Sequence, residues 1–100
     1  MSNEGLEIRH HDEGSQGEYR AHLSNSDKIG RLTWKKRGEN VRVADHTLVP
    51  KEIGGRGIAA ALVDALIKDA RQEGFKIVPQ CSYVEKKFDE HPEWSDLRAL

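Results

Sequence analysis

Three glycines between positions 54 and 57 make this segment the best suited of the chain to binding a ligand. It reads Gly54-Gly55-Arg56-Gly57 and lies between a strand ending in Leu48-Val49-Pro50 and a helix beginning at Ile58. Glycines let the main chain approach a ligand without a Cβ in the way, and a helix start offers unpaired N–H groups at the positive end of its dipole. This predicts an anion site, best suited to phosphate, where Lys51 and Arg56 could add charge-assisted contacts. The same residues also fit a tight strand-to-helix turn that binds nothing.

Two well-known phosphate loops do not fit this segment. A Walker-type loop has Lys and then Ser or Thr after its last glycine, where this chain has Ile58 and Ala59. A dinucleotide-binding loop matches Gly55-x-Gly57-x-x-Ala60, but it needs an acidic residue at the end of the next strand, which here reads Ile77-Val78-Pro79. We therefore expect neither nucleoside triphosphate hydrolysis nor a Rossmann fold.

Cys81 and His46 are the side chains best suited to covalent or acid–base chemistry. Cys81 is the one cysteine of the chain, so it forms no internal disulfide, and a lone cysteine serves either for packing or for reactivity. His46, with an unperturbed pKa of about 6.5, could act as a general base, deliver a water or be structural. His10, His11 and His22 lack metal-ligand spacing, so we expect no metal site.

The elements that must position these residues change in character at Pro50. Before it, apolar and polar residues alternate in segments separated by polar or glycine-bearing turns, which predicts an antiparallel meander. The predicted strands are 6–10, 17–23, 29–34 and 41–49. In the last of them, Val41 to Val49, odd-numbered residues are expected on one face of the sheet and even-numbered residues on the other.

After Pro50 the pattern becomes helical. Apolar residues recur at spacings of three and four over 58–73, which predicts an amphipathic helix capped by Gly74. A short strand over 75–78 and a second helix over 82–90 follow, and the tail is expected to fold back through Trp94 and Leu97. The order predicts an α/β fold with strands first, then the glycine loop, a helix, a strand and a short helix.

Length and composition narrow the possible classes of protein. The chain has 100 residues, with 16 Lys and Arg against 17 Asp and Glu and a formal net charge of -1, which argues against wrapping nucleic acid or coating anionic membranes. We expect a single domain over 1–100, because a second core would not fit. No apolar run approaches the roughly 18 residues that span a bilayer, and Glu4 and Glu7 lie where a signal peptide would be basic and then apolar. We therefore expect a cytoplasmic monomer.

Four segments of the C-terminal half form one pattern. They are His46-Thr47-Leu48-Val49-Pro50, Glu52-Ile53-Gly54-Gly55-Arg56-Gly57-Ile58-Ala59, Pro79-x-Cys81-Ser82-Tyr83-Val84 and His91-Pro92-Glu93-Trp94. The pattern resembles the GNAT superfamily of acetyl-CoA-dependent acyltransferases, and in particular its minimal single-domain members, although the superfamily places Gln or Arg where this chain has Glu52. The resemblance implies a GNAT-like antiparallel or mixed sheet and acetyl-CoA as the cofactor.

The resemblance also implies how individual residues would hold coenzyme A. The backbone of Val49 would offer hydrogen bonds to the pantetheine arm, which can pair like an extra strand. The residues that would cradle the pyrophosphate are Gly54, Gly55, Arg56, Gly57, Ile58 and Ala59.

Catalytic roles follow from the same resemblance. The acetyl group would lie near Cys81, which could accept it covalently or hydrogen-bond to it during direct transfer. His46 is the candidate base. Many superfamily members carry a tyrosine that protonates the leaving thiolate. Its counterpart here is Phe88, which has no hydroxyl, and Tyr83 is an outside candidate for that step.

The leading prediction is an acetyltransferase that moves an acetyl group from acetyl-CoA to an amine acceptor. The alternative is a coenzyme A binding or interaction module with little or no catalysis, and a third possibility is a small protein that does neither. The acceptor stays open among a peptide amine, a polyamine and a small metabolite. We expect no nucleic acid and no membrane among the partners.

Overall fold

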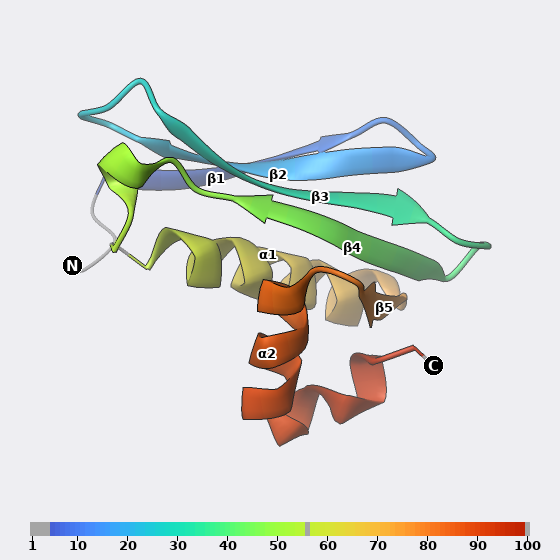
Figure 1. Cartoon of the computed structure of the whole chain (residues 1–100). Coiled ribbons are helices and arrows are strands. Elements are labelled where there is room, and N and C mark those ends of the chain that lie inside the picture. Colours follow the sequence, from blue (N-terminus) through green and yellow to red (C-terminus); the bar gives the residue numbers. More distant parts are fainter. Residues whose placement is uncertain (1–4, 56, 100) are drawn as a thin grey trace.

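The computed structural model describes residues 5–55 and 57–99 (Figure 1). Within these residues the strands form one five-stranded sheet in the order β1-β2-β3-β4-β5. β1 to β4 are antiparallel neighbours, and β5 lies parallel to β4. The strands are Leu6–Asp12, Gln16–Leu23, Ile29–Lys36, Val41–Leu48 and Lys76–Pro79. The predicted meander is confirmed, with strand ends shifted by one or two residues.

Helices cover one face of this sheet. The short 3-10 helix η1 (Lys51–Ile53) and the glycine loop connect β4 to α1 (Ile58–Glu73), which runs along the sheet, and β5 leads into α2 (Ser82–Glu90) and the 3-10 helix η2 (Pro92–Leu97). The opposite face of the sheet has no helix over it in the described chain (Figure 1). The α/β class and the predicted order of elements are confirmed. No described helix is long and apolar enough to cross a membrane.

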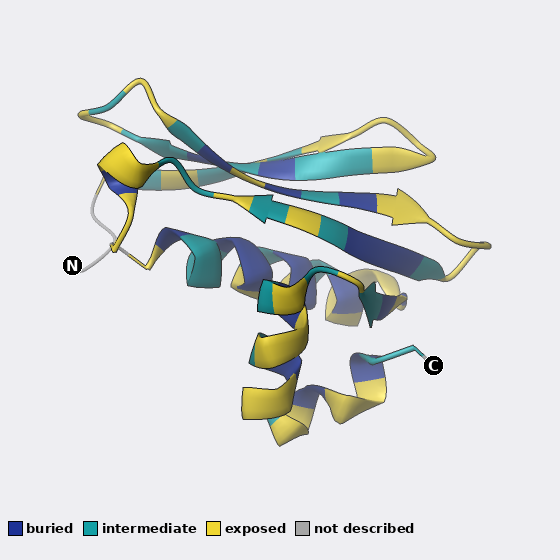
Figure 2. Cartoon of the chain, in the orientation of Figure 1, coloured by how far each residue is buried: buried dark blue, intermediate teal, exposed yellow. Residues whose placement is uncertain are grey.

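The hydrophobic core lies between the sheet and α1, where the dark blue residues of both meet (Figure 2). The buried residues of α1 recur at spacings of three and four, as the sequence predicts: Ile58, Leu62, Val63, Leu66, Ile67 and Ala70. The meander contributes residues that alternate along its strands: Tyr19, Ala21, Leu32 and Trp34. Trp94 and Leu97 are also buried, so the tail folds back as predicted.

A β-bulge in β4 corrects the alternation that the sequence predicts there. Thr33 pairs with His46, but the next residue, Trp34, pairs with Ala44, which leaves Asp45 as an extra residue. Such a residue reverses the side-chain alternation of its strand. Ala44 faces the core beside Trp34, and Thr47 faces the core beside Leu32. In a regular strand Ala44 and Thr47, one even-numbered and one odd-numbered, would lie on opposite faces.

β4 and β5 stay paired over only half the length of β4. Their pairing runs from Val41 with Lys76 to Ala44 with Pro79, and a final bond joins the Cys81 N–H to the Ala44 carbonyl oxygen at 2.9 Å. Beyond this point the chain turns into α2, and the second half of β4 has β3 on one side only. This opening places the end of β4, the start of α1 and the start of α2 around one region of the molecule.

Candidate active site

A groove of about 400 Å³ lies where β4 gives way to α1. Six of the seven residues expected to bind a cofactor line it: Val49, Gly54, Gly55, Gly57, Ile58 and Ala59. The seventh, Arg56, lies outside the described residues. Lys51 from η1, Ala60 from α1 and Tyr83 from α2 complete the wall. The fold therefore collects the described part of the glycine motif around a single concave surface.

The glycine loop has a backbone conformation that requires glycine. Gly55 and Gly57 have φ angles of 73° and 72°, in the left-handed region that other residues avoid. A Cβ at either position would have no heavy atom within 4 Å, so both glycines face open space. Their role in the fold is to turn the chain, and they leave the backbone of the groove free to be approached.

The first turn of α1 suits an anion. Gly57 caps the helix without a side-chain hydrogen bond, and no acidic residue lies in the first turn. Ala61 donates to the Gly57 carbonyl at 3.0 Å, so the N–H groups of Ile58, Ala59 and Ala60 precede the first intrahelical bond. With Lys51 on the wall, the donors and the charge fit a phosphate group.

Cys81 occupies the N-cap position of α2 and faces β4. Its Sγ lies 3.4 Å from the Oγ1 of Thr47, and the side chain is half-buried. Burial alone would raise the pKa of the Cys81 thiol, but hydrogen bonds from the Thr47 side chain and from the backbone of Val84 and Tyr83 outweigh it and lower the pKa below its ordinary value. A lowered pKa increases the thiolate fraction, and the thiolate is the nucleophilic form.

His46 lies on the other face of the sheet. His46 pairs with Thr33 of β3, and its exposed side chain points away from the helices. Within the described chain this side chain makes no hydrogen bond or ion pair. The structure therefore brings Cys81 together with Thr47 and not with His46. A role for His46 stays a prediction, and it would have to act around the open edge of β4.

The two aromatic residues of α2 differ in position. Phe88 is buried and packs edge-to-face against Trp94, with ring centroids 5.7 Å apart, so it serves the core. Tyr83 lines the groove from the side of α2 and is half-buried. Among the described residues that line the groove, Tyr83 alone carries a hydroxyl group. It is therefore the candidate for proton transfer.

Thr47 is the residue that sequence reasoning missed. It appears in the motif segment His46-Thr47-Leu48, but a regular strand would place it on the same face as Asp45 and give it no distinguishing signal. The bulge turns Thr47 toward Leu32 and Cys81, and this depends on how β4 pairs with β3.

Comparison with known proteins defines the class of this fold and site. The family model described as GCN5-related N-acetyl-transferase matches residues 18–97. This match covers most of the chain, from β2 to the end of η2, and includes the glycine loop, Thr47 and Cys81. The chain belongs to the GCN5-related N-acetyltransferase family. A search of curated proteins finds no match to it.

Proposed function

We propose that this protein binds acetyl-CoA in the groove beside the glycine loop and transfers the acetyl group to an amine. One observation carries the proposal. The groove runs along Val49 and the start of α1, and two residues before Val49 the side chain of Thr47 meets a cysteine whose thiol pKa is lowered. An anion site and a cysteine of lowered pKa at one strand end together fit acyl transfer from a coenzyme A thioester through a covalent intermediate.

Backbone groups would hold most of the cofactor. The N–H groups of Ile58, Ala59 and Ala60 and the ammonium of Lys51 suit the pyrophosphate. The open edge at the end of β4, next to Val49, suits an amide-bearing chain that adds to the sheet like a strand. Bound acetyl-CoA supplies the acetyl group as a thioester.

Cys81 then acts as the nucleophile. Its thiolate Sγ attacks the thioester carbonyl carbon, which forms a bond from Sγ to that carbon and breaks the bond to the coenzyme sulfur. The Tyr83 hydroxyl, on the wall of the same groove, would give a proton to the displaced sulfur and regain one from solvent. The acceptor amine next attacks the acetyl group on Cys81, the amide forms, and Cys81 is released as a thiolate while the amine loses a proton to solvent.

Direct transfer, with Cys81 as a hydrogen-bonding partner only, is the competing mechanism. A coenzyme A binding module without catalysis is the competing function, and the outward position of His46 and the core position of Phe88 favour it.

The deciding experiment incubates the protein with isotopically labelled acetyl-CoA in the absence of acceptor. Intact mass and peptide mapping then locate the label, with Cys81→Ala as the control. We expect a hydroxylamine-sensitive acetyl group on Cys81. A second incubation adds an amine acceptor. Transfer to that amine without label on Cys81 in the first incubation would establish the direct route, and coenzyme A binding with neither label nor transfer would establish the binding module.

A further inference from the structure

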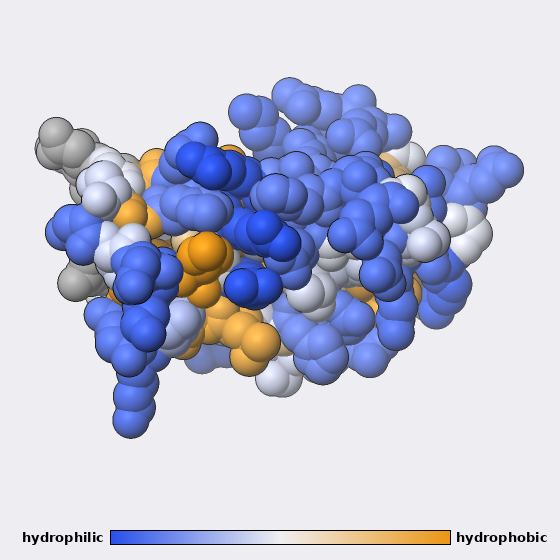
Figure 3. Space-filling model, turned by 90° about the horizontal axis from the view of Figure 1, so that it is seen from above, coloured by the Kyte–Doolittle hydropathy of each residue, from blue (hydrophilic) through white to orange (hydrophobic). Residues whose placement is uncertain are grey.

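The face of the sheet opposite the helices is open, and one end of it is apolar. Seen from above, this face is mostly hydrophilic, with an apolar patch toward the end of the molecule that carries the N-terminus (Figure 3). Leu48 of β4 is 63% exposed, and among the described residues no other large hydrophobic side chain is exposed. Ile29 of β3 is half-buried beside it. Covering Leu48 and Ile29 would remove apolar surface from water, which favours contact with an apolar group of a partner.

This patch forms a groove of about 430 Å³, which we call the Leu48 groove. Its lining includes Asp27, Lys28, Ile29, Arg31, Leu48 and Val49. Val49 also lines the candidate cofactor groove. The two grooves therefore meet at the end of β4, one reached from the helix side of the sheet and the other from the open side.

Arg31 connects the Leu48 groove to a second groove on the open face of the sheet. It lines the Leu48 groove and also a second, polar groove of about 310 Å³ over β2 and β3. Arg31 pairs across the strands with Arg20, and both arginines share one carboxylate, Glu18. Because two guanidinium groups share a single carboxylate here, Arg31 can donate to one further carboxylate.

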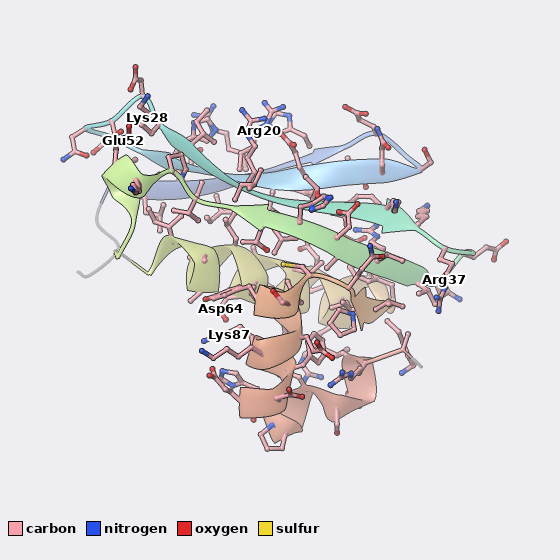
Figure 4. The ribbon with its side chains drawn as sticks, in the orientation of Figure 1. Arg20, Lys28, Arg37, Glu52, Asp64 and Lys87 are labelled. Atoms are coloured by element: carbon pink, nitrogen blue, oxygen red, sulfur yellow. The ribbon has the colours of Figure 1, made fainter. Side chains whose placement is uncertain are left out.

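The donors of Arg31 are available for that anion. Its side chain is 45% exposed, and one nitrogen, Nη1, contacts Glu18 at 3.5 Å. Figure 4 shows Arg20 and Lys28 standing on the same side of the sheet, away from α1. The groove thus combines an apolar floor with cations at its rim, while its one lining acid is Asp27.

We propose that the Leu48 groove binds the acceptor, and that the acceptor is a peptide segment with an apolar side chain next to a carboxylate. The apolar side chain lies on Ile29 and Leu48, the carboxylate meets Arg31, and the amine reaches the cofactor groove past Val49. This inference rests on the proposed acetyltransferase function. A polyamine does not fit, because it would bring further positive charge to Arg31 and Lys28.

The test measures peptide binding directly and does not depend on transfer. The probe is a set of peptides in which one lysine, a spacer of zero to four glycines and a Leu-Asp pair follow one another. Matched sets carry Ser-Asp or Leu-Asn in place of Leu-Asp. Titration of isotope-labelled protein with coenzyme A present is followed by NMR. We expect Leu-Asp peptides to bind at least about fivefold more tightly than either matched set and to shift the amides of Ile29, Arg31 and Leu48.

Two variants and one control assign the contacts. Leu48→Ser is expected to abolish the preference for Leu over Ser, and Arg31→Gln the preference for Asp over Asn. Arg9→Gln is the matched control, because Arg9 is an exposed arginine of β1 that lies in neither groove and pairs with Glu7. Leu48 and Arg31 are both exposed, so thermal unfolding should confirm that the variants stay folded.

Equal affinity for all peptide sets, preferences that survive in Leu48→Ser and Arg31→Gln, or spermidine that competes as well as the Leu-Asp peptides would each overturn the proposal. A separate thermal-shift titration with coenzyme A tests the cofactor groove. If coenzyme A binds while the peptide preferences are absent, the acceptor proposal alone fails. If the preferences hold while coenzyme A does not bind, the acetyltransferase function fails and the peptide site stands.

Discussion

The Sγ of Cys81 and the Oγ1 of Thr47 lie 3.4 Å apart, between the second half of β4 and the start of α2. A threonine hydroxyl can accept a hydrogen bond from a thiol and donate one to a thiolate. Because a bond to a charged group is stronger than a bond to a neutral one, this contact favours the thiolate form of Cys81 and lowers its pKa.

Replacing Thr47 by Val should therefore raise the pKa of Cys81. A lost hydrogen bond to a charged sulfur is worth about 1.5 kcal/mol, so alkylation of Cys81 by iodoacetamide at neutral pH should slow by about tenfold. The pH profile of alkylation is the measurement. Thr47→Ser keeps the hydroxyl and should retain the normal profile. Identical profiles for the Val variant and the parent protein would remove Thr47 from the thiolate site.

Replacing Cys81 by Ala should separate binding from chemistry. The candidate cofactor groove is lined by Val49 and the glycine loop, so coenzyme A should raise the melting temperature of the variant as much as that of the parent. Loss of one half-buried sulfur should cost about 1 kcal/mol of stability. Acetyl transfer should fall to background, measured by release of free coenzyme A.

The pH dependence of the parent protein checks the same residue. Because the thiolate is the reactive form, transfer should rise with pH through the thiol pKa and reach its plateau below the pH at which an ordinary cysteine would. Full transfer by folded Cys81→Ala protein would eliminate the nucleophile and leave the direct route.

Replacing Gly57 by Val should abolish the stabilisation by coenzyme A. Gly57 has a φ of 72°, so a valine there costs about 1–2 kcal/mol of backbone strain, and its side chain would project into the groove that Gly57 lines. Thermal shift with millimolar coenzyme A is the readout.

Gly14→Val is the matched control for that variant. Gly14 has a φ of 95° in the turn between β1 and β2, and a Cβ there would also meet nothing within 4 Å. This variant should lose similar stability and keep its response to coenzyme A. A full response in Gly57→Val would mean that the glycine loop is only a turn.

His10 should make the protein less stable in mild acid. The Trp34 Nε1–H donates to the His10 Nε2 at 3.0 Å, so the proton of the neutral ring is on Nδ1, which lies 3.5 Å from Asp69. Burial lowers the pKa of His10 despite the opposing carboxylates of Asp69 and Asp12. Protonation of Nε2 would also break the bond from Trp34.

The sign follows from proton uptake. The pKa of His10 in the folded protein lies below the ordinary value of about 6.5, so the unfolded chain binds more protons at His10. The contribution of neutral His10 to the free energy of unfolding is therefore complete above about pH 6.5. It is lost as the pH falls through the pKa of the folded protein. Urea unfolding at pH 7.5 and pH 5 measures it. His10→Phe should flatten the difference, whereas His11→Gln, a change at the exposed neighbour, should not.

Local chemistry in the sequence was enough to predict most of the elements and the glycine loop that lines the candidate cofactor groove. The spacing of Ile58, Leu62 and Leu66 defines a helix face, and Gly74 ends that helix with a φ of 82°. Gly55 and Gly57 permit a left-handed backbone turn because glycine has no Cβ, whatever the surrounding fold. Such features depend on neighbours within a few residues along the chain, and so the order of elements and the loop at the start of α1 could be read without the fold.

The partners of the reactive side chains were decided by tertiary structure. Odd and even positions of β4 share a face only while its pairing with β3 is regular, and the extra residue at Asp45 exchanges the faces beyond it. Thr47 therefore meets Cys81, while His46 and Leu48 face the open side. A bulge arises from the fit between two strands far apart along the chain, and nothing in the residues of β4 alone specifies it. For the same physical reason, only the paired sheet brings Ile29 and Leu48 together in one groove.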